Sequence, residues 1–94
     1  MLLSDEDRDY ITKKTIAVIE HIGEIDASIE EKSTEWKISR MGRIELSLIR
    51  LAAFEALFDD VPAKVAIDEA VELAKRYGQP TSYSFVNGVL ARLV

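Results

Sequence analysis

The spacing of the apolar residues constrains the fold of this chain more than any other feature. Proline occurs only at positions 62 and 80, and between and before these breaks apolar side chains recur every three or four residues. That spacing is the repeat of an α-helix with one buried face. No segment carries a strand pattern. The sequence therefore predicts an all-α protein.

The N-terminal third predicts one long helix with a defect. Ser4 is a suitable N-cap, and the three carboxylates that follow it suit the positive end of the helix dipole. A stripe of apolar residues then runs from Ile11 to Ile29. Because glycine weakens a helix interior, Gly23 is expected to bend this helix or to split it in two.

Three further helices are expected beyond a break that contains Trp36. The first spans about residues 42–58, the second about 63–77, and the last begins at Thr81 as its N-cap. The sum is a compact bundle of about five helices in one domain, residues 1–94.

The helix at 42–58 is apolar around most of its circumference, so it should lie at the centre of the bundle. Arg50 and Glu55 lie within it and must either pair or extend to water. In the following helix, Tyr77 is expected on the buried stripe, with Gly78 as the first residue past the helix end.

The charge of the chain is uneven. The 94 residues carry a formal net charge of −5, which disfavours non-specific binding of nucleic acid. Residues 36–50, however, hold four basic residues against Glu45 alone, so an acidic total conceals a basic segment. The chain has no cysteine, no apolar run long enough to span a bilayer and an acidic N-terminus unlike a signal peptide, which together predict a cytoplasmic protein without membrane contact.

Residues for catalysis are scarce. The single histidine, His21, lies one position away from the apolar stripe and is expected at the boundary of the core. Asp59 and Asp60 are better explained by a turn before proline than by a metal site. No metalloprotease, phosphate-loop, hydrolase or calcium-loop motif is present. The sequence thus predicts neither an enzyme nor a cofactor or metal.

The last helix carries the clearest candidate for a binding site. Its apolar stripe is centred about 90° from Phe85 at 100° per residue, so Phe85 should lie at the edge of the core. Thr81, Gly88 and Arg92 fall on the same flank. An aromatic ring beside an arginine can stack a base and hold a phosphate. The alternative is that Phe85 packs on a neighbouring helix and Gly88 allows a close helix contact.

Three motifs resemble those of a known family. Residues 61–75, VPAKVAIDEAVELAK, resemble the NusB-family stretch VPxKVAINEAxELAK. Ser82 with residues 85–90, FVNGVL, looks like its closing motif S-x-x-FVNGVL, and residues 49–55 are similar to its LRxAxYE helix. The resemblance runs from about Asp7 to the end of the chain, in order and without large gaps.

The resemblance implies an all-helical fold and a function in transcription antitermination. Members of the family bind single-stranded boxA RNA together with a small-subunit ribosomal protein, and the pair joins an RNA polymerase complex that resists termination. Carried over by position, Thr81, Ser82 and Phe85 would contact RNA, with Arg92 on the same flank. Glu45, with Arg43 beside it, would contact the ribosomal protein.

This chain departs from the family pattern in two respects. The family generally opens with an arginine-rich segment and two further helices, whereas this chain starts where the family's third helix does. Thr81 also replaces the usual acid before the serine, after an unusual Pro80. The chain could be a fragment, a short paralogue or a protein that covers its apolar surface by self-association, and a homodimer is expected.

Two other functions compete with antitermination. One is a helical adaptor for protein interactions that kept the fold and lost RNA binding together with the basic N-terminal segment. The other is the accessory RNA-binding domain of a ribosomal-RNA cytosine methyltransferase, which shares the fold but continues into a catalytic domain. The negative net charge favours the first of these alternatives.

Overall fold

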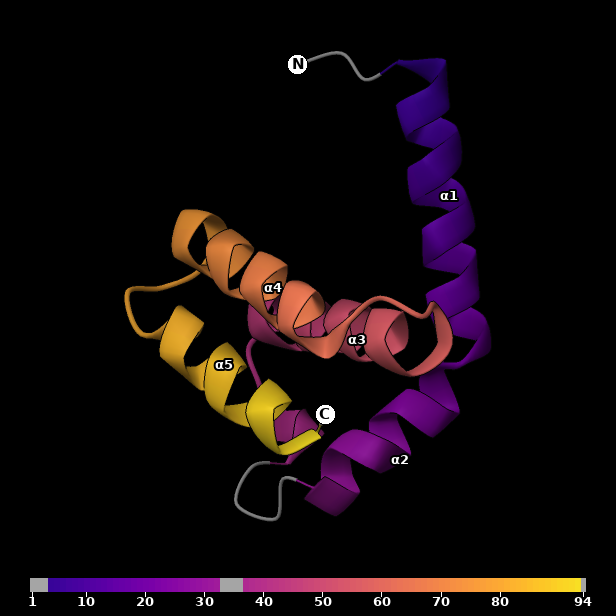
Figure 1. Ribbon diagram of the computed structural model, residues 1–94. Helices are drawn as coiled ribbons and strands as arrows, with labels where there is room; N and C mark the ends of the chain where they lie inside the picture. The colour runs from indigo at the N-terminus through magenta and orange to yellow at the C-terminus, as the bar shows by residue number, and fades with distance from the viewer. Residues whose placement is uncertain (1–3, 33–36, 94) are drawn as a thin grey trace.

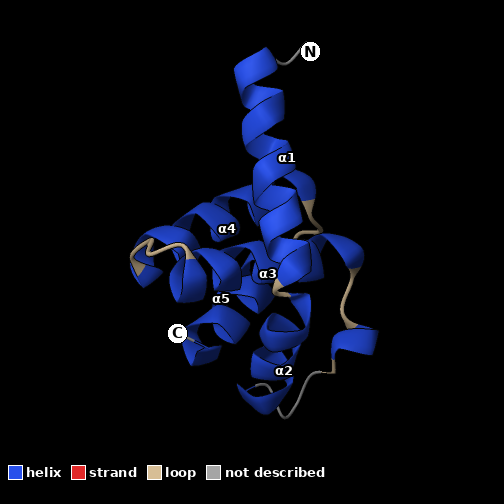
Figure 2. Cartoon of the chain, turned by 90° about the vertical axis from the view of Figure 1, so that its right-hand side faces the viewer, coloured by secondary structure: helices blue, strands red, loops and turns tan. Residues whose placement is uncertain are grey.

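A computed structural model describes residues 4–32 and 37–93, apart from the side chain of Asp7, and contains five α-helices in that part of the chain (Figures 1 and 2). No strand occurs among these residues, so the predicted all-α bundle is confirmed. Trp36 lies outside the described residues. The elements are α1 (Asp5–Glu20), α2 (Ile22–Lys32), the short 3₁₀ helix η1 (Ile38–Arg40), α3 (Arg43–Phe58), α4 (Ala63–Tyr77) and α5 (Ser82–Leu93).

The first long helix is split, but at His21 and not at Gly23, which lies inside α2. The His21 N–H is shared between the carbonyls of Ala17 and Val18, at 3.3 and 3.2 Å. Its imidazole stacks on the ring of Phe58, with centroids 4.4 Å apart. A contact with the end of α3 therefore fixes the bend, which no local propensity could indicate. The prediction that His21 lies at the core boundary is confirmed by its 37% exposed side chain.

Helix α3 lies at the centre of the bundle, as its composition predicts, and packs against α1, α2, α4 and α5 (Figure 1). Small side chains on α3 and α4 allow these helices to approach closely, and branched side chains of α2, α3 and α5 fill the space between them. The buried apolar core comprises Ile25, Ile29, Ile49, Ala52, Ala53, Phe54, Ala66, Ala70, Ala74, Val86, Val89, Leu90 and Leu93.

Arg50 and Glu55, the two charged residues beyond the first turn of the central helix, are both paired, as expected. Arg50 donates two hydrogen bonds to Asp26 of α2, from Nε at 2.9 Å and from Nη2 at 2.8 Å. Glu55 lies 3.7 Å from the Nζ of Lys14, which also bonds to Asp59. These pairs tie α2 to the middle of α3 and α1 to its end.

Burial acts in opposite directions on the pKa values of Lys14 and Glu55, which pair between α1 and α3. Burial alone would lower the pKa of Lys14, but the hydrogen bond that Lys14 donates to Asp59 and the charge of Glu55 outweigh it and leave that pKa raised. Burial also raises the pKa of Glu55, and Lys14 offsets only part of this effect. Lys14 thus remains charged in a position that is mostly shielded from water.

Helix α1 extends away from α4 and α5 (Figures 1 and 2), and much of its apolar surface faces water. Of the predicted stripe, Ile25 and Ile29 are fully buried, but Ile11 is 48% exposed. Tyr10, Ile16 and Ile19 of the same helix are also exposed. The periodicity correctly indicated the apolar face, but that face is fully buried only at Ile25 and Ile29 of α2, and in α1 Val18 is half-buried against the core.

Candidate nucleic-acid interface

A polar groove lies where the start of α3, the preceding η1 and the start of α5 meet. Its volume is about 510 Å³. The helix ends that border it belong to segments almost 40 positions apart, joined through α3 and α4. The residues that line it are Arg40, Met41, Gly42, Glu45, Thr81, Ser82, Ser84 and Phe85.

Ser82 holds the two sides of this groove together. Its hydroxyl donates to Oε1 of Glu45 at 2.7 Å and accepts the backbone N–H of Gln79 at 2.8 Å. The residue is only 1% exposed. A buried hydroxyl with a partner on each side fixes the start of α5 against the first turn of α3.

Gly78 is required by this arrangement, although not for the reason that its position after α4 suggests. Its φ of −94° and ψ of −172° are extended, and any residue can adopt them. A Cβ at this position would lie 2.6 Å from the Cβ of Ser82 and 2.8 Å from the carbonyl oxygen of Ala74. Glycine therefore permits the close approach of the α4–α5 connection to Ser82. Tyr77, expected on the buried stripe, is 67% exposed, because α4 ends there and no described helix covers it.

Glu45 lies over the N-terminus of α3. A Cβ on Gly42, the N-cap of that helix, would come within 2.4 Å of Glu45 Oε2. A larger residue at position 42 would displace the carboxylate. The negative charge thus stands at the positive end of the α3 dipole while it accepts the hydrogen bond from Ser82.

The structure brings together four of the six residues that the sequence singled out. Thr81, Ser82 and Phe85 line the same groove as Glu45. Phe85 is partly buried against the core, as its predicted place at the core edge requires.

The other two predicted residues do not line the groove. Arg43 is the first residue of α3 and is exposed, and Arg92 lies seven positions beyond Phe85, roughly 10 Å along α5. A Cβ at Gly88 would contact nothing within 4 Å, so the alternative that Gly88 allows a close helix contact is not supported.

Arg40, Met41 and Ser84 also line the groove and were not identified from the sequence. Arg40 belongs to the basic segment, which was the only signal available. Met41 and Ser84 lie on a loop and on an exposed helix face, where periodicity carries no information about tertiary neighbours.

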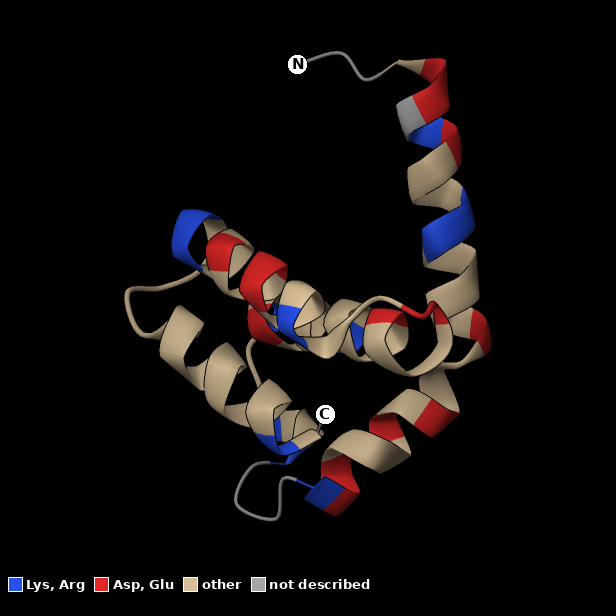
Figure 3. Cartoon of the chain, in the orientation of Figure 1, with Lys and Arg blue, Asp and Glu red and all other residues tan. Residues whose placement is uncertain are grey.

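The two segments that meet at this groove carry most of the positive charge of the chain. Residues 37–50 and 73–94 together contain seven lysines and arginines and one acid, Glu45, whereas the remainder of the chain has a net charge of −11. Figure 3 shows acidic residues along α1 and α2 and none on α5. Of these cations Arg40 lines the groove, while Arg50 is paired with Asp26 and lies at the other hollow. The groove is thus built from the two segments that carry net positive charge in an acidic protein, which favours an anionic partner.

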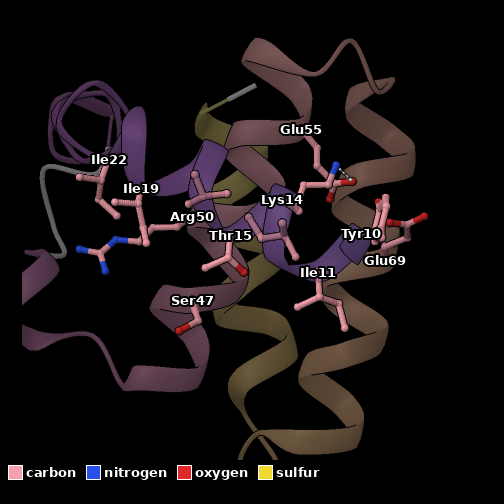
Figure 4. Close-up of a pocket in the computed structure, with 12 residues that line it drawn as sticks. Tyr10, Ile11, Lys14, Thr15, Ile19, Ile22, Ser47, Arg50, Glu55 and Glu69 are labelled. Carbon is pink, nitrogen blue, oxygen red and sulfur yellow. Dashed lines mark ion pairs between the residues drawn. The ribbon is translucent and has the colours of Figure 1, made fainter. Parts of the chain in front are cut away.

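A second hollow, of about 570 Å³, lies between α1 and α3 and differs in character (Figure 4). Its lining is mainly apolar, with Ile11, Val18, Ile19, Ile22 and Leu51 among its residues. The Lys14–Glu55 ion pair lies on its wall. This surface suits an apolar partner better than a nucleic acid.

The described part of the chain offers neither a metal site nor a membrane-spanning helix. No three side chains of histidine, aspartate or glutamate gather there as a metal site would require. None of the described helices is both long and apolar enough to cross a membrane.

The chain is similar to known proteins along almost its whole length. The model of the NusB family matches residues 2–94. "Transcription antitermination protein NusB" of Agathobacter rectalis is 58% identical over 90 residues, covering 95% of this chain and 69% of that protein. The protein of the same name from Lachnoclostridium phytofermentans is 47% identical, covering 98% of this chain and 70% of its own length.

A solved structure, T. maritima NusB, superposes with a TM-score of 0.85 at 34% identity, covering 96% of this chain and 64% of that one. This chain thus spans about two thirds of the length of these relatives. The match of family model, sequence and fold extends over all the elements described above. The chain belongs to the NusB family of transcription antitermination factors, which are not enzymes.

Proposed function

We propose that this chain binds single-stranded, boxA-like RNA in the groove between α3 and α5, together with a small-subunit ribosomal protein, as part of an RNA polymerase antitermination complex. The observation that carries the proposal is the groove in which Thr81, Ser82 and Phe85, at the start of α5, meet Arg40 of the basic segment. Family membership supplies the kind of partner. We also propose that the protein acts in the cytoplasm.

Five residues of the groove have distinct parts in the proposed RNA binding. Phe85 offers a ring edge or face on which an unpaired base stacks, and Arg40 offers a cation for a phosphate. Thr81 and Ser84 are exposed hydroxyls that can bond to a sugar or a base. Ser82 is buried and contributes by positioning the start of α5.

Glu45 and Arg43, in the first turn of α3, are proposed to face the ribosomal protein. Arg43 is exposed beside the groove, and Glu45 is half-buried at its wall. A partner docked there would border the bound RNA, so that each ligand would strengthen the binding of the other.

A protein-interaction adaptor remains a second candidate because of one observation. The apolar hollow between α1 and α3 and the exposed apolar residues of α1 form a surface suited to another protein. This function does not exclude RNA binding, since the two surfaces are separate. The relatives named above are antitermination proteins, which favours antitermination over a methyltransferase accessory domain.

The test is fluorescence anisotropy with a labelled boxA-like RNA and two variants of Phe85. Phe85→Leu retains an apolar side chain but loses the stacking ring, and Phe85→Ala loses both. Both should weaken binding by about fivefold or more. The control is Phe58→Ala, which truncates a 41% exposed phenylalanine at the opposite end of α3. Unchanged affinity in both Phe85 variants, with helicity retained, would contradict the proposal.

A further inference from the structure

A second aromatic residue with a nearby cation lies on the other side of α5. The Nζ of Lys75, in the last turn of α4, is 5.4 Å from the ring centroid of Tyr83. Tyr83 is 42% exposed and Tyr77 is 67% exposed. Tyr83 and Phe85 are two positions apart, so their side chains leave the helix about 200° apart. One ring thus faces α4 and the other lines the groove.

The electrostatic environment of Tyr83 favours a polyanion. Residues 73–94 contain Lys75, Arg76 and Arg92 and no acid. The acid nearest in sequence, Glu72, lies 3.6 Å from Lys75, but the two side chains are 66% and 50% exposed. Water screens such a pair, so Lys75 can exchange this partner for a phosphate at little cost.

The Lys75–Tyr83 pair differs in its charged neighbours from a second lysine–tyrosine pair in the same chain. Lys14 lies at the same distance, 5.4 Å, from the ring of Tyr10. There the cation is neutralised by ion pairs with Asp59 and Glu55. The two pairs share this cation-to-ring distance but differ in the number of acids that neutralise the lysine, which makes the Tyr10 pair a suitable control.

We propose that Tyr83, with Lys75 and Arg76, is a second station for the same single-stranded RNA that occupies the groove. A base stacks on the Tyr83 ring, and Lys75 and Arg76, in the last turn of α4, hold the adjoining phosphates. The strand crosses the first turn of α5 to connect the two stations. This inference rests on the proposed RNA-binding function and extends its footprint.

The affinity of the chain for RNA should depend on whether the strand is long enough to reach both the groove and Tyr83. A helix with its side chains is about 10–12 Å across, so an RNA that fills only the groove cannot reach Tyr83. A longer strand that spans both sides gains a stacked base. Affinity should therefore rise in a step when the strand becomes long enough to reach the second station, and only from one of its two ends.

The experiment measures the binding of a series of single-stranded RNAs, extended nucleotide by nucleotide from either end of a boxA-like core. The wild-type chain should show one step of about fivefold or more. Tyr83→Ala should abolish the step and leave the affinity for the short RNA unchanged, whereas Tyr83→Phe should retain it. Lys75→Gln should reduce the salt dependence for the long RNA only. Tyr10→Ala should have no effect on either.

The outcomes separate the two proposals. A wild-type chain that binds the short RNA but shows no step, or a step that Tyr83→Ala leaves intact, overturns the second station and spares the groove. Loss of the step in Tyr10→Ala as well would also overturn it, because the control pair would then be equivalent. Failure of the wild-type chain to bind any RNA overturns both. An unchanged midpoint of thermal unfolding in each variant verifies that substitution of these exposed residues leaves the fold intact.

Discussion

Ser82 connects three parts of the molecule through one hydroxyl group. It joins the α4–α5 connection at Gln79 to the first turn of α3 at Glu45, and it is shielded from water. Its neighbour Gly78 has no side chain where a Cβ would collide with it. The geometry of the groove therefore depends on a residue that does not itself need to touch the ligand.

Ser82→Ala should lower the free energy of unfolding by about 1–3 kcal/mol, because it removes both hydrogen bonds of a buried hydroxyl, one from the Gln79 N–H and one to Glu45. Chemical denaturation measures this change. The control is Ser84→Ala, because the Ser84 hydroxyl is exposed and donates one hydrogen bond, to the Thr81 carbonyl at 3.3 Å. Equal stability of the two variants would show that the Ser82 hydroxyl does not hold the groove together.

Glu45 is the one acid in the basic segments that form the groove. Glu45→Gln should keep the hydrogen bond from Ser82, because an amide oxygen also accepts, while it removes a negative charge beside the RNA. RNA affinity should rise severalfold and affinity for the ribosomal protein should fall, both measured by titration. A fall in RNA affinity with the fold intact would mean that the carboxylate itself contributes to RNA binding.

The sequence predicts some of these residues and not others for a physical reason. Phe85 could be placed at the core edge because helical periodicity determines which side of α5 it occupies. The bond between Ser82 and Glu45 could not be predicted, since it depends on how α3 and α5 pack. For the same reason the sequence predicts Gly78 only as the residue that follows α4, whereas its close approach to Ser82 depends on how α4 and α5 pack.

At the scale of elements, α1 is the helix least covered by the rest of the described chain. Four of its large apolar residues are 48–62% exposed. Its contact with the end of α3 is formed by His21 on Phe58 and by Lys14 between Glu55 and Asp59. The sequence indicated a helix over this range, but the position of its bend depends on the aromatic contact and could not be read from Gly23.

Lys14→Met should loosen α1 selectively. Methionine keeps the apolar stem of lysine but leaves Glu55 without its cation, so the variant should lose about 1–3 kcal/mol of stability. Amide hydrogen exchange should accelerate in α1 more than in α4 or α5. Lys13→Met is the control, because Lys13 is 80% exposed and pairs only with Asp9, also on the surface. Uniform acceleration across all helices would contradict a local role for Lys14.

At the scale of the whole molecule, two surfaces of different chemistry are separated. The basic groove lies at the junction of α3 and α5, and the apolar surface lies along α1 and its hollow against α3. Helix α3 contributes to both, at its start and along its later turns. This separation is compatible with the proposed RNA binding at the groove and with a protein partner on the apolar surface at the same time.

We expect the chain, studied alone, to self-associate through the apolar surface of α1, because large exposed apolar patches favour association. Sedimentation should show a dimer or larger species that forms with rising concentration. Ile19→Lys, at a 59% exposed position beside the hollow, should shift the chain to monomer. Thr12→Lys, on an exposed polar position of the same helix, should not. A wild-type chain that stays monomeric at every concentration would contradict this expectation.

The most direct test of RNA binding in the groove is a salt titration of the wild-type chain with a boxA-like RNA, alone and with the ribosomal protein. Binding should be saturable, should weaken as salt rises despite the net charge of −5, and should tighten when the ribosomal protein is added. Absence of binding in both conditions, by a chain shown to be helical and folded, would contradict the assignment of RNA binding to the groove between α3 and α5.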